Sequence, residues 1–441
     1  MKTTKLFFMA ALALTFAACS NDDNIIQNPV QQPAKAEGIP FTATISMGES
    51  ASTRALSDNG TKIEATWATG EKVALIYNGV KDEMTVSAVN AGMATITGTI
   101  TGSPSGGDAV TIIYPSDAAD GTTGNVKSDW LSTQDGTLKG TSGTSIEEEY
   151  DVRKGSGALN ASGTSFDGTV SLTNQNAIFK LTLKDIDGTN DVSATSVVIS
   201  DQTGTVTTVT PASATNVMYV ALPTTATTLK FLVTGSDSKK YFNMASGLSL
   251  NASYYQSTVK LATVGDVILS TGKCAKAGTG SPVAMIAYLG SDNGEAAPYN
   301  HGLALALSDA NGGSTCQWST SFTNVHGYKP TSSSFASESG LQYNATQNSD
   351  AYPAFKAAIA NNGTAAPTGC SAWFLASGYQ WQKMAGAVGG LNNLGLQGGA
   401  FYWSSSEFNP YFSAWSFNSG SGNWYNDYKD SAYRVRACLA F

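Results

Sequence analysis

The stretch that decides the fold is Ala177–Leu183, which reads AIFKLTL. It is short, rich in β-branched and aromatic residues, and bounded by polar turn residues, which is typical of a β-strand. Similar runs recur at Lys72–Tyr77, Val110–Tyr114, Ser196–Ser200, Val217–Leu222 and Leu229–Thr234. Gly, Ser, Asn, Asp and Pro separate these runs, and residues 39–262 contain no convincing amphipathic helix. Short strands with frequent turns predict antiparallel β-sandwiches, so the fold class is mainly β.

Beyond Val264 the pattern becomes mixed. Tyr352–Ala360 predicts a short helix, and Ser377–Gln380 matches a capping box that opens a second helix running to Gly389. His301–Ala310 alternates Leu with small or polar residues, as in a half-buried strand. The final residues, Tyr433–Phe441, also alternate, and a strand at a chain end must pair inside the fold to be ordered. We therefore expect this last strand in the middle of a small sheet within an α+β domain.

The chain of 441 residues is long enough for about three domains. Residues 20–38 are polar and lack aromatic residues, which indicates a flexible tether. A Gly/Ser/Thr-rich stretch at residues 138–169 marks a candidate boundary between two sandwiches. These features predict a leader (1–18), a tether (19–38), two β-sandwich domains (39–150 and 151–263) and a mixed domain (264–441).

The N-terminus carries an export signal. Lys2 and Lys5 precede the apolar run Leu6–Ala18, which is long enough for a signal peptide and too short to span a membrane. The run ends in small residues before Cys19, which resembles a lipobox, although Phe16 stands where an aliphatic residue is usual. Cys19 is thus the predicted lipidation site, and the lipid would be the protein's only membrane contact. The alternative is a plain secretory signal followed by an unmodified cysteine.

Charge and cysteine content exclude several classes of protein. The formal net charge is −8, and loss of Lys2 and Lys5 with the leader lowers it to −10, which argues against nucleic-acid binding. Beyond Cys19 the cysteines are Cys274, Cys316, Cys370 and Cys438, which allow three sets of two disulfides. No pair has metal-site spacing and the chain has two His residues, so we expect neither a metal nor a cofactor. No catalytic motif is found, and we expect no enzymatic activity.

The stretch from Phe401 to Tyr433 has the composition of a binding surface. It holds twelve aromatic residues, eight Ser and four Asn, but no Val, Ile or Leu. Rigid aromatic rings combined with adaptable polar side chains are typical of paratopes. The alternative is an aromatic-rich cap on an ordinary domain. We assign Trp403, Tyr433, Val435 and Leu439 to the core. The predicted ligand contacts are Phe408, Asn409, Tyr411, Phe412, Trp415, Asn423, Trp424, Tyr425, Asn426 and Tyr428.

The first half resembles the fimbrillin (Mfa-like, type V pilin) family. The matching stretches are Phe41–Ile45, Ser52–Leu56, Trp67–Val73, Tyr114-Pro115 and Asn176–Lys180. The resemblance implies two transthyretin-like β-sandwiches, secretion as a lipoprotein and assembly with other pilin subunits by strand donation. It also implies proteolytic processing after Arg54, with a solvated loop residue as the alternative. Ser20–Asp23 is similar to the acidic signal that sends lipoproteins of such bacteria to the outer face of the outer membrane.

The second half resembles C-type-lectin-like domains of the formylglycine-generating-enzyme and retroelement-variable-protein kind. The matching stretches are Ser371–Ser377, Gln380-Trp381, Tyr402–Glu407 and Tyr433–Phe441, and Ala376 replaces a usual Pro. The resemblance implies ligand binding by the loops between Trp403 and the final strand. The reactive cysteines of the enzymes and the lectin calcium site have no counterpart here. We interpret Cys370 and Cys438 as a structural disulfide.

Together these features predict a lipid-anchored or fimbrial protein of the outer-membrane surface. It would act as a tip or accessory subunit and bind a protein or glycan through its C-terminal loops. The alternative is a stand-alone surface lipoprotein, or a retroelement-diversified binding protein, that does not polymerise.

Overall fold

The computed structural model describes residues 38–47, 57–58, 63–64, 67–140, 143–325 and 335–441. The predicted leader, most of the predicted tether, Cys19 and Arg54 lie outside these described residues. Within the described part, no helix has the length and apolarity needed to cross a membrane.

The N-terminal sheet is a single eight-stranded ladder in the order β10-β1-β6-β5-β4-β7-β9-β11. Its strands are β1 (Ile39–Ser46), β4 (Lys72–Tyr77), β5 (Val80–Asn90), β6 (Met93–Ile100), β7 (Ala109–Tyr114), β9 (Arg153–Ala158), β10 (Val170–Ser171) and β11 (Thr173–Asn174). The two ends of this order, β10 and β11, are separated in the sequence by Leu172 alone. The sheet must therefore curl until its ends meet, and its halves face each other across one core. A two-stranded sheet, β2 (Ser57–Asp58) with β3 (Ile63–Glu64), lies outside the ladder.

Strand β1 completes this first core. It pairs along its whole length with β6, from Ile39 opposite Ile100 to Ser46 opposite Met93, and its end also pairs with β10. Alternate side chains point inward, as the two-residue period of a strand requires. The inward side chains of β1 are Phe41, Ala43 and Ile45, and all three are buried. Met47, which follows the strand and continues the same alternation, is buried as well.

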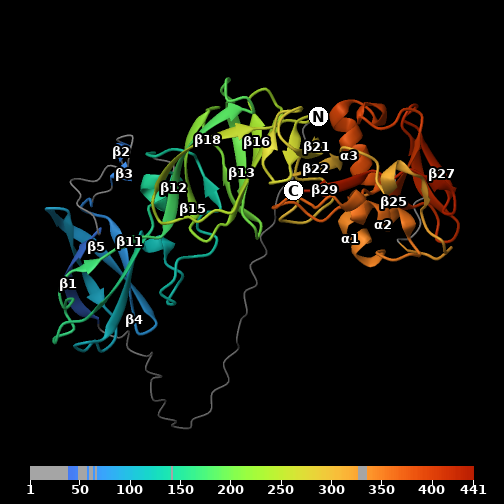
Figure 1. Ribbon diagram of the computed structural model, residues 1–441. Helices are drawn as coiled ribbons and strands as arrows, with labels where there is room; N and C mark the ends of the chain where they lie inside the picture. The colour runs from blue at the N-terminus through green and yellow to red at the C-terminus, as the bar shows by residue number, and fades with distance from the viewer. Residues whose placement is uncertain (1–37, 48–56, 59–62, 65–66, 141–142, 326–334) are drawn as a thin grey trace, which may run out of the picture. The chain divides into compact units, whose positions relative to one another are not determined.

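The middle part is a two-layer sandwich. A three-stranded sheet (β15-β12-β18) packs on a five-stranded sheet (β17-β16-β13-β14-β8) across a shared apolar core. The strands are β8 (Thr133–Gln134), β12 (Asn176–Asp185), β13 (Ala194–Ser200), β14 (Thr205–Val209), β15 (Val217–Pro223), β16 (Thr228–Gly235), β17 (Lys240–Ser246) and β18 (Tyr254–Leu261). Both sheets are visible in Figure 1 in the green range of the chain.

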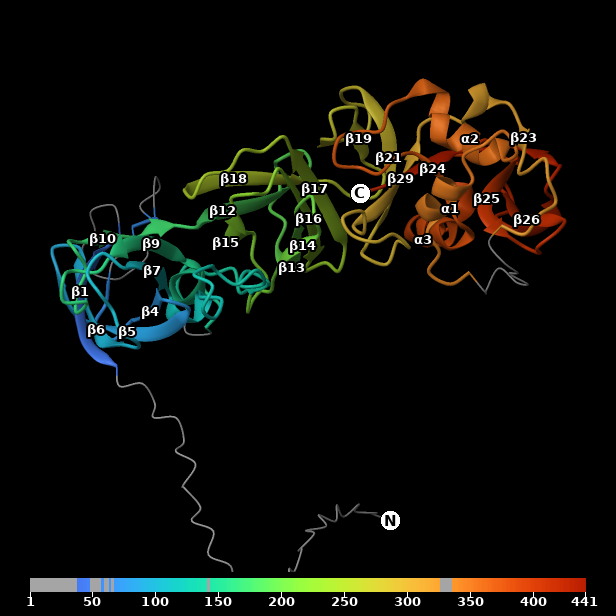
Figure 2. The same cartoon turned by 90° about the horizontal axis from the view of Figure 1, so that it is seen from below.

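The C-terminal part is α+β. Its main sheet has the order β20-β19-β21-β22-β29-β24, and a second sheet has the order β25-β26-β27. The strands are β19 (Val267–Leu269), β20 (Cys274–Ala275), β21 (Pro282–Leu289), β22 (Gly302–Ala306), β23 (Cys316–Gln317), β24 (Phe374–Leu375), β25 (Phe401–Glu407), β26 (Ser413–Asn418), β27 (Trp424–Tyr428), β28 (Ala432–Tyr433) and β29 (Ala437–Ala440). The helices are α1 (Gly340–Thr346), α2 (Pro353–Ala360) and α3 (Gly378–Val388). In both views the second sheet lies at the end of this part away from β21 (Figures 1 and 2).

Short helical turns complete the described secondary structure. They are η1 (Ser116–Ala118), η2 (Ile146–Tyr150), η3 (Asn311–Gly313), η5 (Asn361–Gly363) and η6 (Leu391–Asn393).

Most elements predicted from the sequence are confirmed. All six β-branched runs are strands, and α3 begins at the capping box formed by Ser377 and Gln380. Helix α2 ends at Asn361 in the left-handed conformation. The terminal strand β29 lies between β22 and β24, as expected, but it is shorter than the predicted strand. Strand β22 is buried throughout rather than half-buried, because core clusters cover both of its faces.

The predicted division at residue 150 does not coincide with the sheets. Strands β9, β10 and β11 follow this position in the sequence, yet they pair with β7, β1 and β9 in the first sheet. Strand β8 precedes it, yet β8 pairs with β14 of the middle sandwich. The chain thus crosses between the two parts more than once.

The middle sandwich and the C-terminal part share a core. Leu232 and Phe242 of the sandwich belong to the same buried cluster as Ile286 and Phe441. The rings of Phe242 and Phe441 are 4.4 Å apart, centroid to centroid. The His301 imidazole Nε2 lies 2.9 Å from the Ser200 hydroxyl, again across this junction. The two parts are therefore packed against each other rather than linked by an open hinge.

Candidate binding surface

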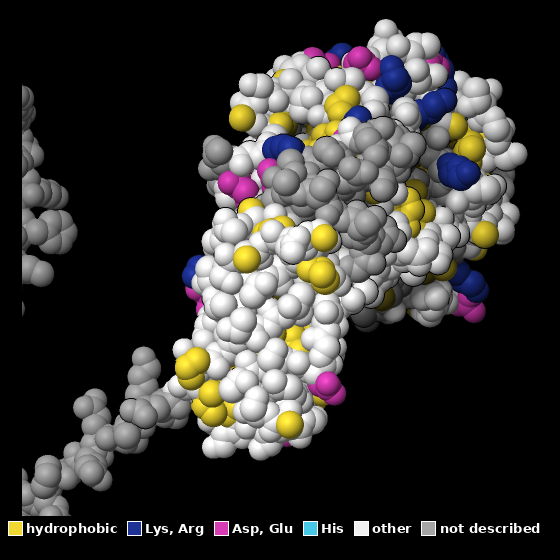
Figure 3. All heavy atoms as spheres, turned by 90° about the vertical axis from the view of Figure 1, so that its left-hand side faces the viewer, with side chains coloured by type: hydrophobic (Ala, Val, Ile, Leu, Met, Phe, Trp, Pro, Cys, Tyr) yellow, Lys and Arg dark blue, Asp and Glu magenta, His cyan; other side chains and the backbone are white. Residues whose placement is uncertain are grey.

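The exposed aromatic side chains gather in the C-terminal part. Among the described residues, the exposed large aromatic side chains are Phe322 (43%), Tyr411 (61%), Phe412 (56%), Tyr425 (39%) and Tyr428 (65%). On the face drawn in Figure 3, hydrophobic side chains outside the grey atoms are instead scattered singly or in small groups, which is ordinary for a protein surface. Grouped exposed rings are the feature that marks an interface.

Three of these rings form one patch, which we call the loop patch: Phe322, Tyr411 and Phe412. The ring centroids of Phe322 and Phe412 are 6.0 Å apart, and those of Tyr411 and Phe412 are 6.1 Å apart. The patch joins two loops far apart in the sequence, the segment after Trp318 and the β25–β26 connection. Tyr428 at the end of β27 lies near the loop patch in space, because the next residue, Lys429, donates its backbone N–H to Phe412 O at 2.8 Å.

A buried ion pair holds both loops from below. Lys429 Nζ donates to Glu407 Oε1, and both side chains are fully buried. The same ammonium donates to Thr323 O at 2.9 Å, and the Glu407 carboxylate accepts from the Val325 N–H at 3.0 and 3.1 Å. Burial lowers the pKa of Lys429, while the hydrogen bond to Glu407 opposes that shift. Paired and hydrogen-bonded buried charges of this kind fix a single loop geometry.

Asn409 shapes the β25–β26 loop. Its side-chain oxygen accepts backbone N–H groups of Tyr411 at 3.1 Å, Phe412 at 2.7 Å and Ser413 at 3.2 Å. This is the local bonding by which Asn stabilises turns. The oxygen of Asn409, which we predicted as a ligand contact, is therefore occupied in presenting the two rings. Phe408 is half-buried and packs against Trp415, with ring centroids 5.3 Å apart.

Trp415 lies beneath the surface, whereas Trp424 is partly exposed. Trp415 is 6% exposed, and Phe335 packs against both tryptophans, with ring centroids at 5.4 and 5.0 Å. Trp424 is half-buried and also contacts Phe417, which is fully buried. The prediction that Trp415 contacts ligand is wrong, because its ring is buried. In this layer aromatic rings take the packing role that Val, Ile and Leu usually fill.

The same reason corrects the interpretation of the whole stretch from Phe401 to Tyr433. Strands β25 and β26 are buried almost throughout, and Trp403, Val435 and Leu439 are fully buried, as predicted for the core residues. Tyr433 is half-buried and stacks on Phe401 at 5.0 Å. Composition alone identified an aromatic-rich stretch but did not separate its packed rings from its exposed ones.

Strand β27 carries the other predicted contacts. Tyr425, Asn426 and Tyr428 are exposed on it, and Asn423 is exposed just before it. Tyr425 packs edge-on against Phe401, with ring centroids 5.2 Å apart, so it belongs to a neighbouring aromatic cluster rather than to the loop patch. Sequence reasoning missed Phe322. Its only local signal is an aromatic residue in a Ser/Thr/Asn-rich loop, and its partner Phe412 is 90 positions away.

The predicted Cys370–Cys438 disulfide does not form in this structure. All four described cysteines are free thiols. Cys438 faces the core cluster that contains Trp381, whereas Cys370 packs against the cluster that contains Leu439. Neighbouring residues of β29 point to opposite faces of the sheet, so the terminal strand separates the two thiols. Burial raises the pKa of Cys370 to about 12, which keeps it protonated.

No family model and no curated protein matches the chain. Among solved structures, a fimbrial protein from Bacteroides ovatus is similar at 14% identity, covering 92% of this chain and 100% of that one, with a TM-score of 0.34. A candidate cell adhesion protein from the same species is 12% identical over 52% of this chain and 95% of that one, with a TM-score of 0.31. A fimbrial assembly protein from Parabacteroides distasonis is 12% identical over 50% and 90%, with a TM-score of 0.28.

Proposed function

We propose that the protein is a cell-surface adhesin that contacts its ligand through the loop patch and Tyr428. The observation that carries this proposal is the grouping of exposed rings above a fully buried ion pair. Exposed aromatic rings are costly in water unless a partner covers them, and pre-ordered loops lose little entropy on binding. We propose no enzymatic role for this surface.

The test is adhesion of beads coated with the protein to cultured epithelial cells and to purified extracellular-matrix proteins. Phe412→Ala and Tyr411→Ala should each lower bead retention at least tenfold, because central aromatic contacts commonly contribute about 2 kcal/mol or more. Met93→Ala is the matched control, since Met93 is an exposed hydrophobic residue of the N-terminal sheet. Equal retention of all three variants and the wild type would remove the loop patch from the proposal.

We further propose that the protein assembles as a fimbrial subunit in which β1 is exchanged for a neighbour's strand. The supporting observation is the position of β1, which ends before Arg54 and is bounded by β6 on one side and β10 on the other. Cleavage after Arg54 would allow β1 to leave. The exposed edge of β6 is then a template for an incoming strand.

The energetics favour replacement over an empty groove. Phe41, Ile45 and Met47 are buried, and each such side chain contributes about 1.5–3 kcal/mol on burial. Loss of β1 alone would therefore cost on the order of 5–10 kcal/mol, before its backbone hydrogen bonds are considered. A donor strand with apolar residues at the same alternate positions would restore most of this free energy of burial.

Arg54→Ala tests assembly. The variant should keep a longer chain and lose any SDS-resistant ladder of oligomers, because its own β1 still fills the groove. A wild-type protein that begins at Cys19 and stays monomeric would instead support the stand-alone surface lipoprotein. We place the protein at the outer-membrane surface with Cys19 as the lipid attachment site. Cys19→Ala should release it or leave an unprocessed precursor, detectable by protease treatment of intact cells.

A further inference from the structure

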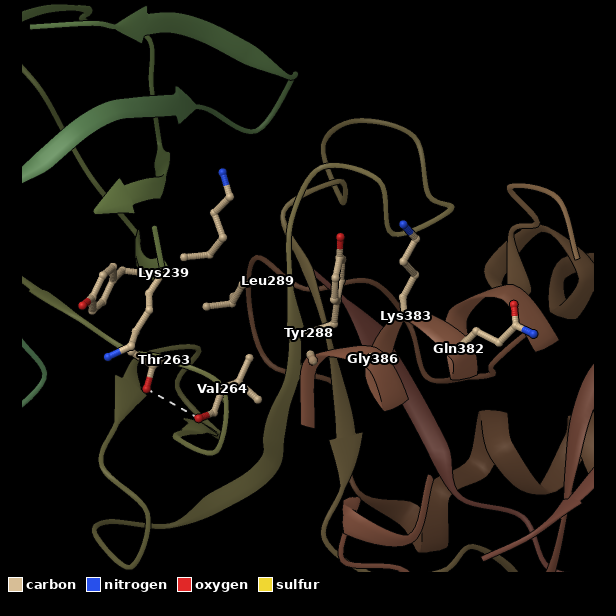
Figure 4. A pocket seen from close by; sticks show the side chains of 11 residues that line it. Lys239, Thr263, Val264, Tyr288, Leu289, Gln382, Lys383 and Gly386 are labelled. Carbon is tan, nitrogen blue, oxygen red and sulfur yellow. Dashed lines mark hydrogen bonds between the residues drawn. The ribbon is translucent and has the colours of Figure 1, made fainter. Parts of the chain in front are cut away.

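A groove of about 750 Å³ lies between β17 and helix α3, lined by residues distinct from those of the loop patch. Lys239 and Lys240 line one side, and Lys383 and Gly386 of α3 line the other. Figure 4 shows the Tyr288 ring standing beside Lys383, with Leu289 and Val264 between this pair and Lys239. The volume of the groove lies in the range of small-ligand sites, and the groove combines apolar walls with a few polar groups, as such sites do.

The groove concentrates positive charge in an acidic protein, whose formal net charge is −8. Lys239 pairs with Asp237 at 3.4 Å, and Lys383 pairs with Asp292. Lys240 donates to the Thr234 hydroxyl, a neutral acceptor, at 2.7 Å. The residues that line the groove thus include three lysines and no Asp or Glu, which gives it a cationic lining suited to an anionic ligand, while the Asp266 carboxylate accepts from the Thr263 N–H at 2.8 Å.

The walls of the groove are fixed. Tyr288 and Lys383 both donate to Asp292, and the Lys383 ammonium lies 6.0 Å from the Tyr288 ring centroid. On the other side, Phe242 of β17 and Ala262 exchange backbone hydrogen bonds of 2.8 Å in both directions. These bonds occupy the edge of β17 at Phe242, so a peptide could not add as a strand along the full length of β17. The groove therefore offers a ligand mainly side chains, and the Tyr288 ring among them favours a sugar ring over an acidic peptide.

We propose that this groove binds an acidic saccharide, a sugar chain that carries carboxylate groups. The lysine ammonium groups form charge-assisted hydrogen bonds with the carboxylates. The Tyr288 ring offers a flat apolar face to the C–H side of a sugar ring. Gln382 and Thr263 also line the groove; an amide can donate to and accept from sugar hydroxyls, and the Thr263 hydroxyl, which donates to Asp266 Oδ2 at 3.4 Å, can accept from one. This site is independent of the proposed adhesion through the loop patch.

The test is calorimetric titration of the full mature protein with tetragalacturonate, at low and at moderate ionic strength. The wild type should bind, and the affinity should fall as salt rises. Lys240→Gln should weaken binding at least tenfold, and Lys240→Arg should retain most of it because the charge remains. Gly386→Trp should block the groove, whereas Gly386→Ala should have a smaller effect. A Cβ at Gly386 meets nothing within 4 Å and the position is helical, so both variants should fold.

Matched controls make the outcomes decisive. Lys356→Gln removes an exposed lysine outside the groove and should bind as the wild type does. Phe412→Ala should also bind tetragalacturonate normally, so failure of the adhesin proposal would not affect this result. The proposal is overturned if the wild type does not bind the probe or if Gly386→Trp binds it unchanged. It is equally overturned if the fully methyl-esterified oligomer or a hexaglutamate peptide binds as tightly.

Discussion

The buried pair of Glu407 and Lys429 gives the sharpest test of how the binding surface is built. Glu407→Gln keeps the size of the side chain but removes its charge. Gln has one acceptor oxygen, whereas the Glu407 carboxylate serves both the Lys429 ammonium and the Val325 N–H. Removing one partner of a buried pair leaves an uncompensated charge and costs about 3–5 kcal/mol. We expect local destabilisation of that size, which should appear first in the segments 319–325 and 408–412.

Amide hydrogen exchange of the full mature protein measures this effect locally. The Val325 N–H and the Lys429 N–H, which is bonded to Phe412 O, should exchange roughly 10²- to 4 × 10³-fold faster in the variant, at about 1.4 kcal/mol per tenfold change. The matched control is Glu83→Gln, which breaks the half-exposed Lys72–Glu83 pair and should cost about 1 kcal/mol or less.

The pH dependence separates a charge effect from simple loss of packing. Burial already lowers the pKa of Lys429, and loss of Glu407 removes the interaction that raises it. In the folded variant the Lys429 amine should therefore bind its proton more weakly than it does in the unfolded chain. Its stability should rise as pH increases towards the unfolded lysine pKa. If the exchange rates of Glu407→Gln and Glu83→Gln change equally, or if the deficit does not shrink between pH 7 and pH 10, the ion pair does not hold the loops.

Three further outcomes follow from the structure. Trp403→Ala should destabilise the C-terminal part by about 3–5 kcal/mol in urea unfolding, because the side chain is fully buried, while Tyr428→Ala should leave the transition nearly unchanged. Burial, with a smaller effect from Lys230, lowers the pKa of His301 to about 4, so the unfolded chain binds more protons below pH 6.5. Stability should fall by up to roughly 3 kcal/mol between pH 6.5 and 4, and His301→Gln should reduce this dependence in urea midpoints. Asn409→Ala should speed hydrogen exchange at the Tyr411, Phe412 and Ser413 amides, which donate to its side chain, without altering exchange in the N-terminal sheet. If these three amides exchange at the same rate in the variant and the wild type, Asn409 does not stabilise the turn.

Local pattern by itself determined most of the secondary structure. Runs such as Ala177–Leu183 contain enough β-branched and aromatic residues to specify a strand wherever they pack. The capping box at Ser377 and the buried face of Trp381 and Met384 specify α3 in the same way, because the helical period is local. The alternation near the C-terminus likewise predicts Val435 and Leu439 in the core, where both are fully buried.

Only the tertiary structure decided which aromatic rings form the binding surface. Trp415 and Phe412 are three positions apart in a stretch of uniform composition, yet one is buried beneath Phe335 and the other is exposed beside Phe322. Their difference depends on partners that are distant in the sequence, and no local period encodes such partners. The closure of the first sheet by β9–β11 and the separation of Cys370 from Cys438 have the same origin. Pairing across long sequence distances is set by the packing of the whole chain.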